Sequence, residues 1–195
     1  IDVVNKIDDS TDMIMELLED PTEKDRPFDR RGLAFGYVQS GKTAHFTGVI
    51  NKAIDSGYQL IIVLAGMHND LRSQTQMRLD EEVLGYENSV KHTNKNKDNR
   101  IGVGTMIGHE FFEVDSPTDR SESGDFQSKR ALTFNKQIMV VKKNAIVLEK
   151  LLVAIQNSPQ AMYMNSEDEG KPDCKFIHNV PILIIDDEAD QASVD

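Results

Sequence analysis

The eight residues 36–43 read Gly-Tyr-Val-Gln-Ser-Gly-Lys-Thr and match the pattern GxxxxGK[ST] in full. Such a loop binds phosphates, because glycine lets the backbone approach them and N–H groups at a helix N-terminus attract anions. Lys42 would reach the β and γ phosphates of a nucleotide, and the Thr43 hydroxyl would bind Mg²⁺. The predicted nucleotide-binding residues are Gly36, Gln39, Ser40, Gly41, Lys42 and Thr43, and Lys42 is also a predicted catalytic residue. An ordinary glycine turn is the alternative, and the strand-to-helix context argues against it.

A second group of reactive side chains follows the apolar residues 182–185, where four carboxylates stand within five positions. In open parallel sheets ligands bind at the carboxyl ends of the strands, so a merely solvated acidic turn is the weaker interpretation. We assign Asp187 to the metal, through water, and Glu188 to the water that attacks the terminal phosphate. Asp186 remains an alternative for the metal role.

Rigid elements must hold both motifs, and the hydrophobic pattern predicts them. Residues 31–37 have the pattern of a strand. Residues 43–56 have that of a helix closed by Gly57, and residues 60–65 that of a buried strand. Further along, the pattern predicts a helix from its cap Asn69 towards Gly85, strands at 101–105, 138–141 and 182–185, and a helix at 145–155. Strands alternating with helices predict an α/β domain with a mainly parallel sheet flanked by helices.

Three stretches lie outside this alternation. Ser10 precedes apolar residues at helical spacing, which predicts a short amphipathic helix capped by Ser10 and ended by Pro21. Residues 113–129 and 157–179 are rich in polar and acidic residues, so we predict that both are surface excursions.

Composition limits the partners. The chain has 22 Lys and Arg against 33 Asp and Glu, a net charge of −11, so any contact with DNA must be local. No apolar run approaches the roughly 20 residues that span a bilayer, which predicts a cytoplasmic protein with no membrane contact. The single cysteine cannot form an intramolecular disulfide.

Several segments together resemble known proteins. The residues Asp187-Glu188-Ala189-Asp190 resemble the DEAD motif of superfamily-two helicases, and residues 64–75 resemble the motif that precedes it in those proteins. The combination of GYVQSGKT, IIVLAGMHNDLRSQTQMRLDEE, VVKKNAIVLEKLL and ILIIDDEADQASV is more specific. It resembles the bacterial Z-one domain family, helicase-like proteins described as endonucleases and found in restriction–modification and related defence contexts.

The resemblance implies that residues 31–195 form part of the first RecA-like lobe of a DNA-dependent ATPase or translocase that uses ATP and Mg²⁺, with residues 1–30 as a separate helical segment. It also implies a second lobe that this chain lacks, so we expect the chain alone to hydrolyse almost no ATP. In such lobes the strand that follows the acidic motif lies between the P-loop strand and the acidic strand. The sequence ends at Asp195, before such a strand, so we expect a gap in the sheet that leaves Phe35 and Ile184 poorly covered. Gln39 stands where DEAD-type helicases usually have glycine, which leaves the loop geometry there open.

Other interpretations of the same residues remain. A nucleotide switch or kinase also uses a P-loop, and a non-catalytic interaction module could keep the fold, although the intact motifs count against it. The basic residues between Lys91 and Arg100 could touch DNA, but a solvated loop is favoured because no aromatic residues interleave. Lys142 and Lys143 are equally compatible with facing DNA or not. Residues 169–173 place a Glu-x-Lys element before the acidic residue, the reverse of the usual nuclease order, so we predict no nuclease site here.

Overall fold

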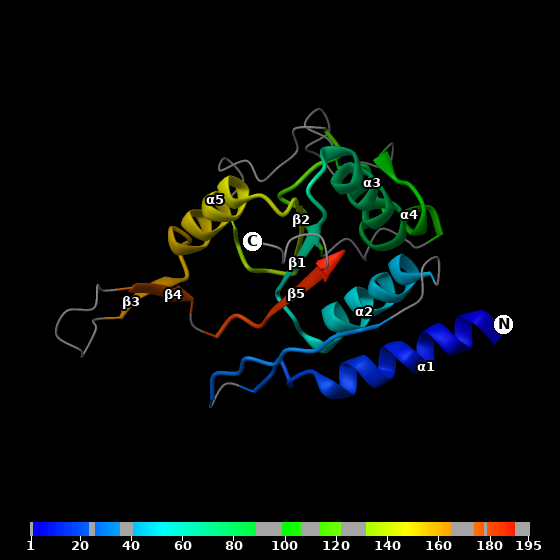
Figure 1. Ribbon diagram of the computed structural model, residues 1–195, viewed down its shortest axis with the longest axis horizontal. Helices are drawn as coiled ribbons and strands as arrows, with labels where there is room; N and C mark the ends of the chain where they lie inside the picture. Colours follow the sequence, from blue (N-terminus) through cyan, green and yellow to red (C-terminus); the bar gives the residue numbers. More distant parts are fainter. Residues whose placement is uncertain are drawn as a thin grey trace.

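The computed structural model of the chain describes residues 2–23, 26–35, 41–88, 99–106, 114–121, 132–164, 174–177 and 179–189 (Figure 1). At its centre lies a three-stranded parallel sheet in the order β2-β1-β5. Its strands are β1 (Leu60–Ala65), β2 (Gln137–Val141) and β5 (Ile182–Asp187). Helices pack on both faces of this sheet, so the predicted α/β fold with a parallel sheet is confirmed.

The other elements of the described ranges surround this sheet. They are the helices α1 (Asp2–Leu17), α2 (Lys42–Ser56), α3 (Asn69–Leu79), α4 (Val103–Met106) and α5 (Ala145–Gln156), the π-helical turn η1 (Asp80–Leu84), and the antiparallel strands β3 (Ala161–Met164) and β4 (Cys174–Ile177). The pair β3–β4 extends away from the parallel sheet (Figure 1). The predicted strands at β1, β2 and β5 and the predicted helices at α2 and α5 are confirmed, with small shifts of their ends.

The pleat of β1 sends alternate side chains to opposite faces of the sheet. Ile61 and Val63 pack on one face in a cluster that includes residues of α2, α3 and η1. Leu60 and Ile62 pack on the other face with residues of α5. All four side chains are buried, and each contributes roughly 1.5–3 kcal/mol by leaving water. Cover on both faces explains why β1 is an unbroken apolar run.

Helix α1 packs on α2 (Figure 1). A Cβ atom at Gly48 would lie only 3.0 Å from Thr11 Cγ2, so glycine allows the close approach of the two helices. Ser10, predicted as the cap of this helix, instead lies inside it, because the helix already begins at Asp2. The Ser10 hydroxyl donates to the Lys6 carbonyl one turn earlier, at 2.7 Å.

The strand predicted at 31–37 is wrong over residues 31–35, which form no regular element. Phe35 is 89% exposed, and on β5 Ile184 is 60% exposed. Among the described strands β5 pairs only with β1. The poor covering expected for these two side chains is therefore confirmed. A strand also needs a neighbour that pairs its backbone groups, and the hydrophobic pattern carries no information about that neighbour.

Two boundaries differ from the prediction for local reasons. The strand predicted at 101–105 is wrong, because Gly102 has a φ of 48° and turns the chain into the short helix α4. Asn69, predicted as the cap of α3, is the first helical residue, and His68 is the N-cap residue. The helix also ends at Leu79 and passes into η1.

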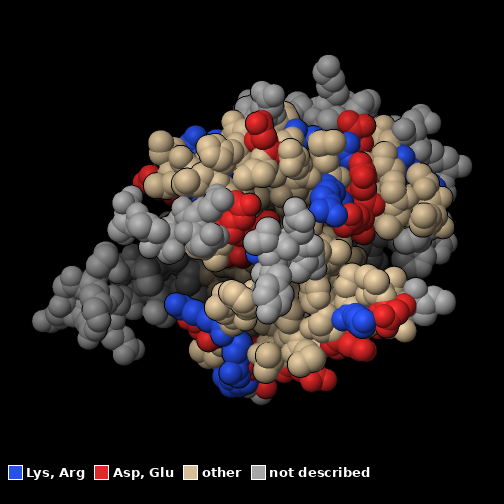
Figure 2. Space-filling view, turned by 45° about the vertical axis from the view of Figure 1, so that its right-hand side comes forward, with Lys and Arg blue, Asp and Glu red and all other residues tan. Residues whose placement is uncertain are grey.

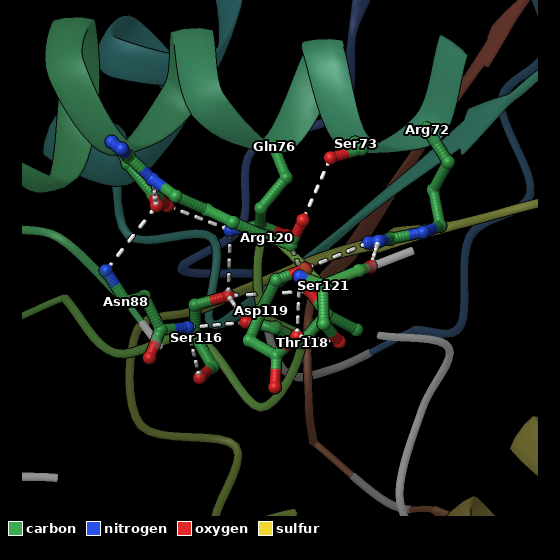
Figure 3. A network of polar contacts seen from close by, with 10 residues as sticks. Arg72, Ser73, Gln76, Asn88, Ser116, Thr118, Asp119, Arg120 and Ser121 are labelled. Atoms are coloured by element: carbon green, nitrogen blue, oxygen red, sulfur yellow. Dashed lines mark hydrogen bonds and ion pairs between the residues drawn. The ribbon is translucent and has the colours of Figure 1, made fainter. Parts of the chain in front are cut away.

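The segment 114–121, part of a predicted surface excursion, is largely buried, so that prediction is wrong for these residues. Figure 3 shows Arg72 and Gln76 of α3 directed towards this segment. The Arg72 guanidinium is fully buried and donates to the carbonyls of Asp119, at 2.9 Å, and Ser121. Hydrogen bonds to polar side chains thus replace hydrogen bonds to water in this segment. The composition of the segment carries no information about such partners.

Asp80 is a buried carboxylate at the end of α3 within this polar network. It accepts hydrogen bonds from Gln76 Nε2 at 2.7 Å, from Arg120 Nε at 2.6 Å and from the Asn88 N–H at 3.2 Å. Burial raises the pKa of Asp80 to about 6, because the charged form is removed from water, although the bonds from Gln76 and Arg120 oppose this rise. The ion pair therefore reduces the cost of burial without cancelling it.

We expect Asp80→Asn to flatten the pH dependence of stability. The folded-state pKa of Asp80 lies above the ordinary value of 3.8 for an aspartate, so its contribution to stability is complete below that pH and is lost as pH rises through about 6. Between about pH 4 and about pH 7 the wild type should lose more unfolding free energy than the variant, by at most about 3 kcal/mol. Urea unfolding followed by circular dichroism measures this difference. Equal losses in the two proteins would contradict the raised pKa.

Candidate functional site

A hollow of about 180 Å³ lies at the carboxyl ends of β1 and β5, beside the first turn of α2 and one face of α3. Thr43 of the phosphate-loop motif and Asp187 and Glu188 of the acidic motif all line it. The remaining lining residues are Ala65, Gly66, Leu71, Gln74, Thr75 and Arg78. The fold thus brings together three of the predicted site residues from distant parts of the sequence.

The last three residues of the phosphate-loop motif lie at the start of α2. Gly41 is its N-cap residue, with a φ of 77° and a ψ of 29°, a left-handed conformation that glycine adopts without strain. Lys42 is the first helical residue and is exposed. The predicted residues Gly36, Gln39 and Ser40 lie outside the described residues.

Alternation along β5 separates the two aspartates. Leu183 and Ile185 pack in the cluster on the α2 side of the sheet, and Ile182 packs on the α5 side. By the same alternation Asp187 belongs to the α2 side and Asp186 to the α5 side. Asp187 accordingly lines the hollow, whereas the Asp186 carboxylate lies 2.5 Å from the Lys143 amine. This geometry favours Asp187 over Asp186 for a metal beside Thr43.

Glu188 follows the strand in a strained conformation. Its φ of 55° is left-handed, which costs a residue with a Cβ about 1–2 kcal/mol. Its N–H donates to Asp187 Oδ1 at 3.1 Å, and its carbonyl accepts from Lys143 Nζ at 2.6 Å. Strain of this kind often persists at functional sites, where surrounding contacts hold it.

The Glu188 carboxylate lies close to Gly66, which has no side chain. Gly66 follows β1 with a φ of 53°, and a Cβ at this position would lie 3.2 Å from Leu71 Cδ1 and 3.3 Å from Glu188 Oε2. A side chain there would therefore be strained and would press against the carboxylate.

The two lysines that follow β2 are turned inward. Lys142 is partly buried, and its amine donates to Asn69 Oδ1 at 2.7 Å. Lys143 is buried against the acidic motif, so of the two sequence interpretations the structure disfavours a direct DNA contact by this residue. Nothing in their adjacent positions in the sequence distinguishes these two environments.

Two polar residues of α3 that the sequence analysis did not assign to the site, Gln74 and Arg78, line the hollow. Arg78 Nε lies 3.5 Å from Glu82 Oε1, one helical turn away. The i, i+4 spacing of Gln74 and Arg78 places them on one helix face. The spacing indicates from sequence that the two side chains lie on the same face. Only the packing of α3 shows that this face meets the hollow.

The donor set fits a magnesium–nucleotide pair. Across the described residues, no three His, Cys, Asp or Glu side chains cluster so as to hold a metal by themselves. Magnesium in such sites is commonly held by one or two protein oxygens, with water and phosphate oxygens completing its shell. The Thr43 hydroxyl and the Asp187 carboxylate, lining one hollow, provide a set of that kind.

No family model matches the chain, and neither curated proteins nor solved structures include a significant match. No helix in the described part of the chain is both long and apolar enough to cross a bilayer.

On the face shown in Figure 2, basic side chains lie in small groups beside acidic ones and form no broad positive patch among the described residues.

We expect Gly66→Ala to lower the free energy of unfolding by about 1–2 kcal/mol, because alanine is strained at this left-handed position. Gly32→Ala is the matched control, since a Cβ at Gly32 meets nothing within 4 Å and its φ is not left-handed. The control should change stability by less than about 0.5 kcal/mol. Chemical denaturation of both variants tests this, and equal stabilities would show that the Gly66 turn is not constrained.

Proposed function

We propose that this chain binds ATP with Mg²⁺ as the nucleotide-binding lobe of a P-loop ATPase. The observation that supports this most is that Thr43, at the start of α2, lines the same hollow as Asp187 and Glu188, at the end of β5. A phosphate loop and an acidic strand end meeting in this way provide an anion site, a metal site and a general base together.

Within that class we propose a helicase-like, DNA-dependent ATPase or translocase with a RecA-like lobe, of the kind found in the Z-one domain family and acting in restriction–modification or defence. The four resembling segments support this: three of them supply residues that line the hollow, and the fourth contains Lys143, which contacts the acidic motif. DNA as the substrate, a second lobe that completes the site, and a cytoplasmic location belong to the same proposal. The net charge of −11 restricts DNA contact to particular elements.

In this proposal different residues bind the phosphates, hold the metal and activate the water. Lys42 and the N–H groups at the start of α2 bind the phosphates and offset their charge. The Thr43 hydroxyl and the Asp187 carboxylate hold Mg²⁺, which offsets charge on the phosphates when bound. Glu188 orients the attacking water and accepts its proton, and the hollow limits the positions that this water can take.

A nucleotide switch is the alternative class. It would bind the same ligand through the same loop but would not couple turnover to DNA. DNA-stimulated ATPase activity of the full-length protein would favour the motor, and nucleotide binding without stimulation would favour the switch.

We expect Lys42→Ala to weaken ATP–Mg²⁺ binding at least about tenfold, because a charge-assisted contact to phosphate is lost. Lys150→Ala, at an exposed position of α5, removes the same charge far from the hollow and should bind as the wild type does. Isothermal titration calorimetry measures both affinities. Unchanged binding by Lys42→Ala would refute the assignment of the loop.

In the full-length protein Glu188→Gln should bind ATP–Mg²⁺ normally but hydrolyse it at least about a hundredfold more slowly, since the amide cannot accept a proton. Asp187→Asn should instead require more Mg²⁺ for binding. Mg²⁺ titrations and single-turnover rates separate the two effects. If both variants lose metal dependence alike, the division of roles between Asp187 and Glu188 is wrong.

A further inference from the structure

Lys143 is a lysine whose side chain is only 4% exposed, and it follows β2. In the sheet, β2 and the acidic strand β5 flank β1. An ammonium group removed from water is costly unless other groups compensate its charge and bind its protons. The contacts of this amine therefore show which groups compensate its charge.

Both partners of the amine belong to the acidic motif. Lys143 Nζ lies 2.5 Å from Asp186 Oδ1 and donates to the Glu188 carbonyl at 2.6 Å. To reach them it passes the end of β1, which separates β2 from β5. The chain turns at Gly66, whose carbonyl accepts from the Lys143 N–H at 2.8 Å. Lys143 is thus held by its backbone at β1 and by its side chain at the end of β5.

These two contacts act on different parts of the turn. The bond to the Glu188 carbonyl fixes the peptide plane that follows a left-handed residue, and so restrains the backbone from which the Glu188 carboxylate projects into the hollow. The ion pair neutralises the Asp186 carboxylate, which strand alternation places on the opposite face of the sheet from Asp187.

We propose, resting on the proposed function, that Lys143 is a positioning residue for hydrolysis. It holds Glu188 in its left-handed conformation, aimed at the attacking water, and neutralises Asp186 on the opposite face of the sheet. Nucleotide affinity does not depend on it, because Lys143 does not line the hollow.

Two substitutions in the full-length protein separate these contacts. Lys143→Met keeps most of the length of the side chain and removes its amine donor, while the backbone N–H bond to Gly66 remains. Asp186→Asn removes the ion pair but leaves the bond to the Glu188 carbonyl. Lys150→Met, at an exposed position of α5, is the matched control for the loss of one lysine charge. Far-UV circular dichroism establishes that each variant is folded.

We expect Lys143→Met to slow single-turnover hydrolysis about tenfold to a hundredfold, because the base is misplaced, while the Kd for ATP–Mg²⁺ stays within about twofold. Asp186→Asn should slow it less, and the control not at all. Without nucleotide, amide hydrogen exchange of a peptide covering residues 182–189 should speed up in Lys143→Met and not in Lys150→Met.

Wild-type turnover and wild-type exchange in Lys143→Met would overturn the proposal. Equal losses in Lys143→Met and Asp186→Asn would overturn it too, since the ion pair alone would then explain the effect. Should Lys143→Met not fold, Lys143→Gln retains a shorter donor and should show the same order of effects at smaller size. Absence of nucleotide binding by the wild type would defeat the proposed function, whereas faster exchange in the variant would still show that Lys143 holds the turn.

Discussion

The pairing of β1 with β5 is the interaction on which the rest of the structure depends. Its register places Leu64 opposite Asp186 and Ala65 opposite Asp187. Because successive side chains of a strand face opposite sides, a slip of one residue would exchange the faces of the two aspartates. The register is specified by burial, since Leu183 must reach one apolar cluster and Ile182 the other. Packing of apolar side chains thus decides which carboxylate lies beside Thr43.

The site itself is made where regular structure stops. The end of β1, the turn after β2 and the end of β5 meet at one edge of the sheet, because parallel strands bring their carboxyl ends together. At this edge the chain adopts left-handed conformations at Gly66 and Glu188. The first is tolerated because glycine has no side chain, and at the second the Glu188 carbonyl accepts a hydrogen bond from Lys143 Nζ. A charged residue outside the hollow therefore shapes a residue inside it.

Polar groups also stabilise the far side of α3. The helix carries Leu71 and Arg78 towards the hollow and Arg72 and Gln76 towards segment 114–121. Within that segment the Thr118 hydroxyl accepts from the Val140 N–H of β2 and ties the segment to the sheet. The network therefore restrains the helix that lines the hollow. Buried hydrogen bonds of this kind are directional, so they favour one orientation of α3 more sharply than apolar contacts alone.

The sequence by itself determined the central elements and the candidate chemistry. Unbroken apolar runs predicted β1, β2 and β5, and the motif residues predicted Thr43, Asp187 and Glu188, because these signals are local in the chain. Tertiary structure alone decided that residues 31–35 form no strand, that 114–121 is largely buried, and which groups Lys143 and Gly66 contact. Each depends on a partner distant in sequence: a neighbouring strand, buried hydrogen-bond acceptors, or a carboxylate across β1. Residue type shows which bonds a side chain can make, and only the fold decides which of them it makes.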